Sequence, residues 1–234
     1  MLNRYNPEHI ALVTIDMWDN HYCKTFAAWT NELAVRMNPF LDRVRQNGIQ
    51  IIHMAADVSS AYRGTPQRDK MLLPDGVNPE DAIPDYAARP NPPGRWPVGG
   101  CVCYQSSNPE ALTCPLVYNW SRLNPNLRID DSDLIGDGEE LAYYCDQRDI
   151  HWLYYVGIAG NVCVLDARPF SMEQMGYLGI KTYLIGDMTE SFVTGVPREI
   201  GNIRTRLYIH RYVAPVTDSV EFIEGIEKFR ANKK

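Results

Sequence analysis

Residues 152–179, WLYYVGIAGNVCVLDARPFSMEQMGYLG, carry the strongest local pattern in the chain. The first five are aromatic or aliphatic, which is typical of a buried strand. The next five are small and predict a tight turn, and from Val162 onward apolar residues recur at helical spacing. Asn161 suits the N-cap of that helix and Gly179 suits its end. This stretch therefore predicts a strand, a tight turn and a helix in direct succession.

Cys163 falls in the first turn of the predicted helix. Free backbone N–H groups and the helix dipole favour a thiolate there, so the pKa of Cys163 should fall. The same N–H groups can hold an oxyanion that develops on a carbonyl under attack. The alternative is an inert cysteine buried in the core, and this stretch alone leaves both interpretations open.

The chain opens with a similar unit. The continuous apolar run IALVTI, residues 10–15, predicts a central parallel strand with Asp16 at its carboxyl end. An amphipathic helix is expected over about 27–46, followed by a second strand over 49–54. Together these segments predict one right-handed βαβ unit.

Alternating strands and helices continue in the second half of the chain. We expect a short strand or two turns within 127–135, helices over 138–148, 192–203 and 219–230, and strands over 180–185 and 206–212. The alternation predicts an α/β fold with three αβα layers, a Rossmann-like, doubly wound, mainly parallel sheet of about six strands. We expect residues 1–234 to form a single domain.

A long irregular excursion at about 57–126 interrupts this pattern. It holds most of the 16 prolines, and also Trp96, Tyr104, Tyr118 and Trp120. A polar linker would not carry so many aromatic residues, so we expect an ordered segment that covers the domain as a lid or a subunit contact. A mobile loop is the alternative.

Bulk composition excludes several classes of protein. The net charge of −6 argues against nucleic-acid and membrane partners, and no apolar run approaches the ~20 residues that span a bilayer. Residues 1–10 lack an apolar signal core, which predicts a cytoplasmic location. Six cysteines in a cytoplasmic chain of this length are expected to remain thiols.

Strand order predicts where the reactive residues meet. In the common order 3-2-1-4-5-6, the order reverses between the first and fourth strands, and ligands bind at the carboxyl ends there. Asp16 ends the first predicted strand and Cys163 follows the fourth. A carboxylate beside a thiol can take its proton or pass a proton to a leaving amine.

These residues resemble a known family. TIDMWDNHYC, residues 14–23, and GIAGNVCVLDARPFSMEQMGYLG, residues 157–179, are similar to the aspartate and nucleophile motifs of the isochorismatase-like cysteine hydrolase superfamily, which includes nicotinamidases, N-carbamoylsarcosine amidase and biuret hydrolase. The resemblance implies a nucleophilic Cys163, a catalytic Asp16 and a cis peptide bond at Ile158-Ala159. It also implies an oxyanion hole made by the backbone N–H groups of Ala159 and Cys163.

Two features of the family pattern are absent. The superfamily's third catalytic residue is a lysine, but residues 123–140 contain none, and Arg128 is the nearest cation in sequence. We therefore expect Arg128 to be the catalytic cation, with Lys24 as an alternative. The metal-binding histidine pair of nicotinamidases is also missing around His53, so neither a metal nor another cofactor is expected. Cys101-x-Cys103 with Cys114 lacks a fourth ligand at a usable spacing for zinc.

The expected substrate pocket draws on three parts of the sequence. We expect Trp18, His21, Asn161, Trp96 and Trp120 to line it. His21 has the alternative of lying in a surface loop. For Arg168 and Asp187, a structural salt bridge is favoured over a substrate-binding role.

Two functions remain open on the sequence. The favoured one is a metal-independent cysteine hydrolase, acting on a small amide, ureide or vinyl ether through a covalent intermediate on Cys163. The other is a weakly active or inactive relative that binds a small molecule or acts as an oligomeric interaction module. Under either hypothesis we expect a small-molecule partner and a homo-oligomer.

Overall fold

The computed structural model describes residues 6–77, 101–103, 114–115 and 117–232. Its centre is one six-stranded sheet in the order β3-β2-β1-β4-β5-β6, in which every neighbouring pair is parallel. The strands are β1 (Ile10–Ile15), β2 (Gln50–Met54), β3 (Leu134–Gly136), β4 (Trp152–Gly157), β5 (Lys181–Thr189) and β6 (Val216–Thr217). The predicted doubly wound parallel sheet, with its reversal between β1 and β4, is confirmed.

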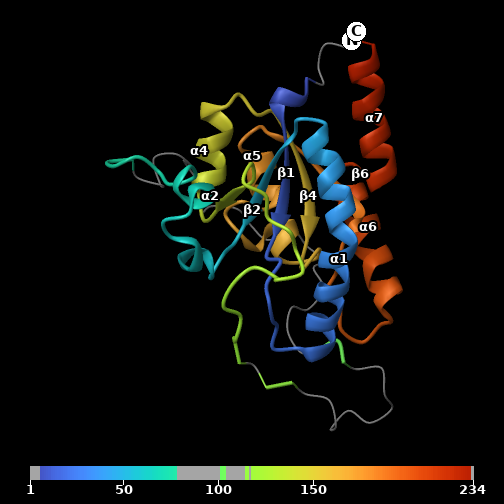
Figure 1. Cartoon of the computed structure of the whole chain (residues 1–234). Helices are drawn as coiled ribbons and strands as arrows, with labels where there is room; N and C mark the ends of the chain where they lie inside the picture. Colours follow the sequence, from blue (N-terminus) through green and yellow to red (C-terminus); the bar gives the residue numbers. More distant parts are fainter. Residues whose placement is uncertain (1–5, 78–100, 104–113, 116, 233–234) are drawn as a thin grey trace.

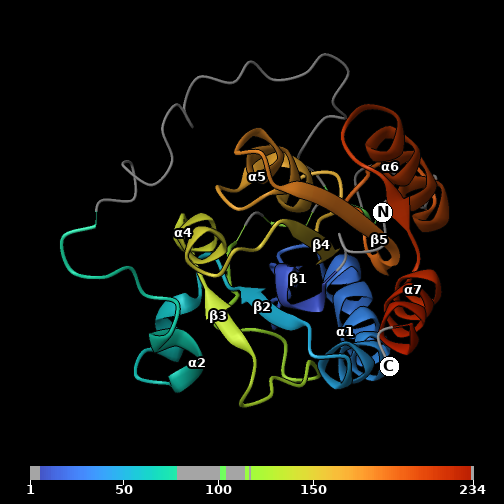
Figure 2. The ribbon, with the colours of Figure 1, turned by 90° about the horizontal axis from the view of Figure 1, so that it is seen from above.

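Helices cover both faces of the sheet (Figures 1 and 2). On one face lie α1 (Lys24–Gln46) and α7 (Ser219–Ala231), and on the other lie α4 (Glu140–Gln147), α5 (Met172–Tyr177) and α6 (Arg198–Tyr212). Side chains of β1 alternate between the two cores: Leu12 packs with the first layer, and Val13 and Ile15 with the second. Burial on both faces explains why β1 is continuously apolar.

The helix predicted after Asn161 is broken in the structure. Residues Cys163–Ala167 form a single π-helical turn, Arg168 is extended, and α5 begins only at Met172. Pro169 is the physical reason, because proline disfavours a helical conformation in the residue before it. The interruption turns Arg168 out of the helical path.

The strand predicted over 206–212 is wrong, because these residues belong to α6. Gly201, Thr205 and Ile209 are the buried residues of α6, and their spacing of four is the period of a helix with a narrow buried stripe. The helix predicted over 192–203 begins later, at Arg198, with Pro197 as its N-cap. The sixth strand is the two-residue β6.

The described parts of the excursion are packed against the domain. Two short helices, η3 (Ser59–Tyr62) and α2 (Pro66–Asp69), follow β2. The Tyr62 hydroxyl accepts a hydrogen bond from the Leu123 N–H at 2.9 Å, and the Arg68 guanidinium pairs with the buried Glu140 carboxylate at 2.6 and 2.8 Å. Trp96 and Tyr104 lie outside the described residues.

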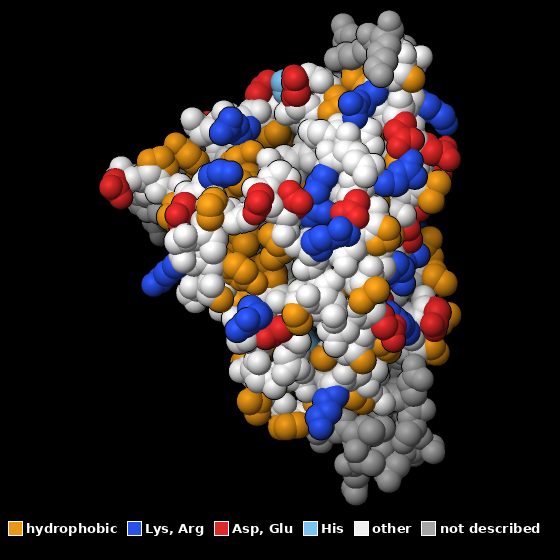
Figure 3. All heavy atoms as spheres, in the orientation of Figure 1, with side chains coloured by type: hydrophobic (Ala, Val, Ile, Leu, Met, Phe, Trp, Pro, Cys, Tyr) orange, Lys and Arg blue, Asp and Glu red, His pale blue; other side chains and the backbone are white. Residues whose placement is uncertain are grey.

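Within the described part of the chain, no helix is both long and apolar enough to cross a bilayer. On the face shown in Figure 3, acidic and basic side chains are interspersed, with no large patch of either sign. A short 3-10 helix, η2 (Pro7–His9), leads into β1.

Candidate active site

The carboxyl ends of β1 and β4 are held in direct contact by Gly157. Its φ of +114° lies in a region that other residues rarely adopt, and a Cβ there would collide with the backbone of Ile15. The residue after Ile15 is Asp16, and the turn after Gly157 leads to Cys163. Glycine at this position therefore lets the turn at residues 158–162, which we call the nucleophile turn, lie against β1, the strand that leads to Asp16.

The nucleophile turn has the backbone that the family resemblance implied. The Ile158-Ala159 peptide bond is cis. Gly160 donates its N–H to the Glu190 carbonyl at 2.8 Å, and Glu190 donates back to the Gly157 carbonyl at 3.0 Å, which fixes the turn to the end of β5. The backbone N–H of Ala159 interacts with the Cys163 thiol. That N–H therefore faces the sulfur of Cys163.

Asp16 and Cys163 meet at the switch point, as the topology predicted. The Asp16 side chain is fully buried and interacts directly with the thiol. Its Oδ2 accepts a hydrogen bond from Arg168 Nε at 3.0 Å, while its Oδ1 makes no hydrogen bond of ordinary geometry. Asp16 also has a φ of +48°, which is uncommon outside glycine.

The electrostatics of the pair differ from the sequence prediction. Burial raises the pKa of Asp16 to about 7, although Arg168 and the thiol oppose the shift. Burial also raises the pKa of Cys163, the negative charge of Asp16 raises it further, and Arg168 only partly offsets both. The predicted fall in the pKa of Cys163 is therefore wrong, since a single π-helical turn does not outweigh desolvation and a neighbouring carboxylate.

Arg168 is the cation of the site. Besides Asp16, its guanidinium binds Asp57 Oδ2 at 2.8 Å and lies 5.6 Å from the Trp18 ring centroid. The salt bridge predicted for Arg168 is confirmed, but it joins the two carboxylates of the site. A positive charge thus stands beside the Asp16–Cys163 pair.

Arg128 does not reach this site. Its guanidinium binds Asp42 at 2.6 Å on the surface, where 56% of the Arg128 side chain is exposed. Lys24 is also exposed, at the first position of α1. Arg128 was expected to be the catalytic cation because it is near the family's lysine position in the sequence. The structure places Arg168 beside the thiol, because the helix is interrupted between the π-helical turn and Pro169.

A cavity of about 530 Å³ opens above the thiol. Its wall is mostly aromatic. The lining residues are Trp18, His21, Tyr22, Phe26, Asp57, Tyr118, Trp120, Ile158, Ala159, Val162, Cys163, Arg168 and Phe192. The predicted positions of Trp18, His21 and Trp120 at the cavity are therefore met, and Tyr118 joins them from the excursion.

The aromatic wall is assembled from two distant segments. Trp18 and Trp120 stack with ring centroids 4.2 Å apart, and Trp18 forms an antiparallel bridge with Leu123. His21 accepts a hydrogen bond at Nδ1 from the Cys23 N–H at 3.1 Å, and burial lowers the pKa of His21 to about 4. The imidazole is thus neutral at pH 7, with its proton on Nε2.

Several predicted residues lie elsewhere. The Asn161 side chain is buried and bonds both backbone groups of Phe192, at 2.7 and 2.9 Å, so it supports the wall instead of lining the cavity. It does not cap the π-helical turn. The carboxylate of Asp187, predicted in a salt bridge, accepts from the Ser219 N–H at 2.8 Å. Trp96 lies outside the described residues.

Asp57 and Phe192 were missed by the sequence analysis. Asp57 lies just beyond β2, so the rule that ligands bind at carboxyl ends could have found it. Phe192 follows β5 in an irregular segment, and no local pattern distinguishes it from a core residue. Its place in the wall depends on the two hydrogen bonds between the Asn161 side chain and the Phe192 backbone.

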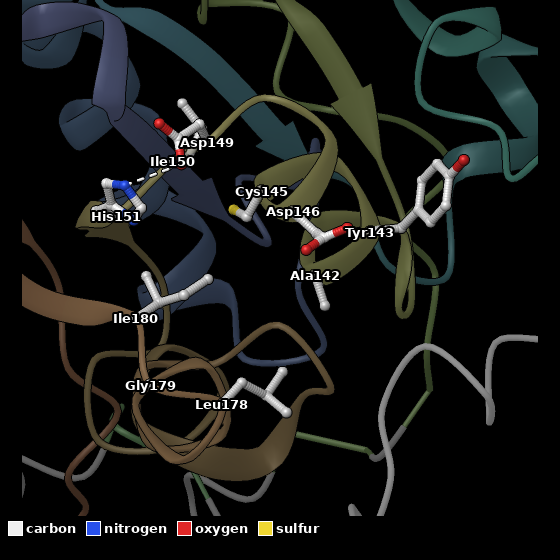
Figure 4. A pocket seen from close by; sticks show the side chains of 10 residues that line it. All are labelled: Ala142, Tyr143, Cys145, Asp146, Asp149, Ile150, His151, Leu178, Gly179 and Ile180. Atoms are coloured by element: carbon white, nitrogen blue, oxygen red, sulfur yellow. Dashed lines mark ion pairs between the residues drawn. The ribbon is translucent and has the colours of Figure 1, made fainter.

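A second hollow of about 520 Å³ lies at the opposite, amino-terminal edge of the sheet (Figure 4). It is lined by segments that precede β4 and β5, and an ion pair joins His151 and Asp149 at 3.0 Å. Cys145 is its thiol, but burial raises the pKa of Cys145 and no described cation or base contacts it. Cys145 is therefore a poorer candidate for a nucleophile than Cys163, which has a carboxyl group and a cation beside it.

Comparisons with known proteins agree with the fold. No protein-family model and no curated protein matches the sequence. Among solved structures, a cysteine hydrolase from Pseudomonas syringae pv. phaseolicola 1448A is 17% identical, with 96% of this chain and 95% of that chain covered and a TM-score of 0.57. An isochorismatase family protein from Burkholderia thailandensis is 14% identical, with 95% and 97% covered and a TM-score of 0.56.

A third similar structure is an isochorismatase-like hydrolase from Alkaliphilus metalliredigens, at 12% identity, with 94% and 97% covered and a TM-score of 0.52. The structural neighbours of this chain across nearly its whole length are thus isochorismatase-family proteins. At these identities, the likeness establishes the α/β fold of that family for this chain.

Proposed function

From the fold that it shares with isochorismatase-family cysteine hydrolases, we propose that this chain is a cysteine hydrolase of the same type. It would cleave a small amide, ureide or related substrate through a covalent intermediate on Cys163. The observation that carries the proposal is the contact of Asp16, Cys163 and Arg168 at the floor of one cavity. A thiol, a proton acceptor and a cation are the three groups that such chemistry needs.

In the first half-reaction, the Asp16 carboxylate takes the Cys163 proton and the sulfur attacks the substrate carbonyl. An S–C bond forms, and the carbonyl electron pair moves to oxygen. The N–H groups of Ala159 and Cys163 would hold that oxyanion. As the C–N bond breaks, Asp16 returns the proton to the leaving amine, and a thioester remains on the enzyme.

In the second half-reaction, a water molecule attacks the thioester. Asp16 takes a proton from the water, and the acid leaves as the S–C bond breaks and the thiol regains its proton. A carboxyl whose pKa is about 7 suits both directions of transfer near neutral pH. Arg168 positions this carboxyl and offsets the charge that forms on sulfur.

The cavity wall favours a small, flat and uncharged substrate. Its aromatic side chains offer apolar contact area, and the neutral His21 adds a hydrogen-bond donor. Arg168 already pairs with two carboxylates, which compensate its positive charge and leave less attraction for an anionic substrate. A planar amide or ureide fits this chemistry better than a charged metabolite does.

A second candidate function is a ligand-binding relative with little activity. The raised pKa of Cys163 favours it, because a protonated thiol is a weak nucleophile. The two candidates differ in whether a bond to sulfur forms.

Mass spectrometry of the intact protein after exposure to a panel of small amides and ureides separates them. A hydrolase is expected to gain the mass of an acyl group and to release the amine, and Cys163→Ala should abolish both. The matched control is Cys145→Ser, which removes a buried thiol outside the site and should retain both signals. A panel without adduct or turnover, but with saturable binding, would favour the binding protein.

Location and assembly belong to the same proposal. We propose a cytoplasmic protein, supported by six cysteines that are all free thiols in the structure. We also propose a homo-oligomer, which sedimentation velocity of the purified chain tests directly.

A further inference from the structure

Four cysteines form one cluster that does not include Cys163. They are Cys23, Cys101, Cys103 and Cys114, and their sulfur atoms all lie within 4.8 Å of one another. Zinc was not expected from the sequence, because Cys101-x-Cys103 and Cys114 lack a fourth ligand at a usable spacing. The fold supplies that ligand from Cys23, almost 80 residues away along the chain.

The sulfurs lie slightly closer together than the ligands of one bound zinc ion would, and all of them are near enough to share one ion. Cys23 Sγ lies 3.2 Å from Cys101 Sγ and 3.6 Å from Cys103 Sγ, and Cys114 Sγ lies 3.1 and 3.6 Å from the same two atoms. A tetrahedral zinc with bonds of about 2.3 Å places its sulfurs about 3.8 Å apart. Disulfide bonds, at about 2.05 Å, are much shorter than any of these separations.

The surroundings of the cluster suit thiolates. The Cys103 N–H donates to Cys101 Sγ at 3.3 Å, and Thr25 Oγ1 donates to Cys103 Sγ at 3.0 Å. Such donors are the usual outer partners of metal-bound sulfur. Cys23 is the N-cap residue of the 23-residue helix α1, whose first turn contains no acidic residue. Thiolates would provide the negative charge that this helix end favours.

We propose that Cys23, Cys101, Cys103 and Cys114 bind one structural zinc ion. Four sulfur ligands close the coordination sphere, so the ion has no open position for substrate or water. The assignment does not depend on the proposed hydrolase activity, since none of the four residues contacts Cys163 or lines the cavity.

The ion would fasten the cavity wall. His21, Tyr22 and Phe26 lie within three residues of Cys23, and Tyr118 and Trp120 follow Cys114 closely. Tyr22 and Tyr118 contact each other across these two segments, with ring centroids 6.1 Å apart. A zinc ion between the segments would hold both sides of the aromatic wall in register.

The first test measures metal in the full-length protein, purified under reducing conditions and reconstituted with Zn²⁺ alone. We expect one zinc per chain, with X-ray absorption showing four sulfur neighbours at about 2.3 Å. The double variant Cys101→Ser/Cys114→Ser should lose the zinc, and Cys145→Ser should keep it. Zinc retained by the double variant, or zinc with nitrogen or oxygen neighbours, would overturn the assignment.

A second test uses only the wild-type protein, so it does not depend on whether a variant folds. Alkylation by iodoacetamide is followed for each cysteine by peptide mass spectrometry, with Zn²⁺ or with a chelator. Removal of zinc should expose all four cluster cysteines together and leave Cys145 unchanged. Equal labelling with and without zinc would refute the proposal, and so would two disulfides in the reduced preparation.

Discussion

The Cys163 thiol and the Asp16 carboxyl share one buried corner, where burial raises the pKa of both groups and the negative charge of Asp16 raises the pKa of Cys163 further. At neutral pH, the thiol therefore keeps its proton, and the carboxyl, whose pKa is about 7, is only partly ionised. The pair titrates as a unit, so activity should follow the pair instead of either residue alone. Arg168 is the described cation whose charge opposes both shifts.

Asp16→Asn separates reactivity from catalysis. Because it removes a negative charge, it lowers the pKa of Cys163, and alkylation by iodoacetamide at pH 7.5 should rise by about tenfold or more. Hydrolysis should fall by about 10²–10⁴-fold, since the proton acceptor is lost. Alkylation rates across pH 6–10 measure the first effect, and an unchanged rate profile would contradict the assigned contact.

Arg168→Gln should act in the opposite direction on the thiol. Loss of the guanidinium raises the pKa of Cys163, so alkylation at pH 7.5 slows and kcat/KM falls by about 10²-fold. Arg168→Lys should recover only part of this, because one ammonium does not reproduce the two-sided bond to Asp16 and Asp57. Arg128→Gln is the matched control and should stay within about twofold of wild type.

At the scale of the element, the junction of β1 and β4 depends on one missing Cβ. Gly157→Ala forces a side-chain atom into the backbone of Ile15 and an unfavourable φ on the new residue. We expect a loss of about 3 kcal/mol or more in the free energy of unfolding, measured by urea denaturation.

Gly179→Ala is the control for this effect. Gly179 also has a positive φ, of +89°, but a Cβ there meets nothing within 4 Å. Its loss should be about 1–2 kcal/mol, from backbone conformation alone. Equal losses for the two variants would mean that the contact with Ile15 relaxes freely.

At the scale of the whole molecule, a buried polar network joins α1, β1, β2 and the segment before β3. Asp133 accepts from Arg45 at 2.6 and 2.9 Å and lies 3.0 Å from His53 Nε2, while His53 Nδ1 meets Thr14 Oγ1 at 2.8 Å. Burial alone would raise the pKa of Asp133, but the hydrogen bonds from His53 and Arg45 hold it well below its usual range.

The sign of the resulting pH dependence follows from that direction. A carboxyl with a lowered pKa in the folded state stabilises the protein above the unfolded value of about 4, and this stabilisation is lost as pH falls further. Wild type should therefore lose about 1 kcal/mol more than Asp133→Asn between pH 6 and pH 3, as measured by urea midpoints. Parallel pH profiles for the two proteins would contradict the network.

Local patterning was sufficient for most of the framework. The apolar runs of β1 and β4, the amphipathic stripe of α1 and the glycine-rich turn before Cys163 each have short-range causes, and they imply the parallel sheet and the meeting of Asp16 with Cys163. The strand predicted over 206–212 failed because its residues satisfy a helical stripe only once Gly201, Thr205 and Ile209 pack on the sheet.

Only the tertiary structure determines which cation contacts Asp16, which residues form the aromatic cavity wall, and which cysteine completes the four-sulfur cluster. Arg168 became the partner of Asp16 because Pro169 interrupts the helix, and Asn161 serves Phe192 because the end of β5 lies beside the nucleophile turn. Cys23 joins Cys101, Cys103 and Cys114 only after the excursion returns to the start of α1. Strands and turns arise from neighbours in the chain, whereas ion pairs, cavity walls and ligand shells arise from residues that only folding brings within reach.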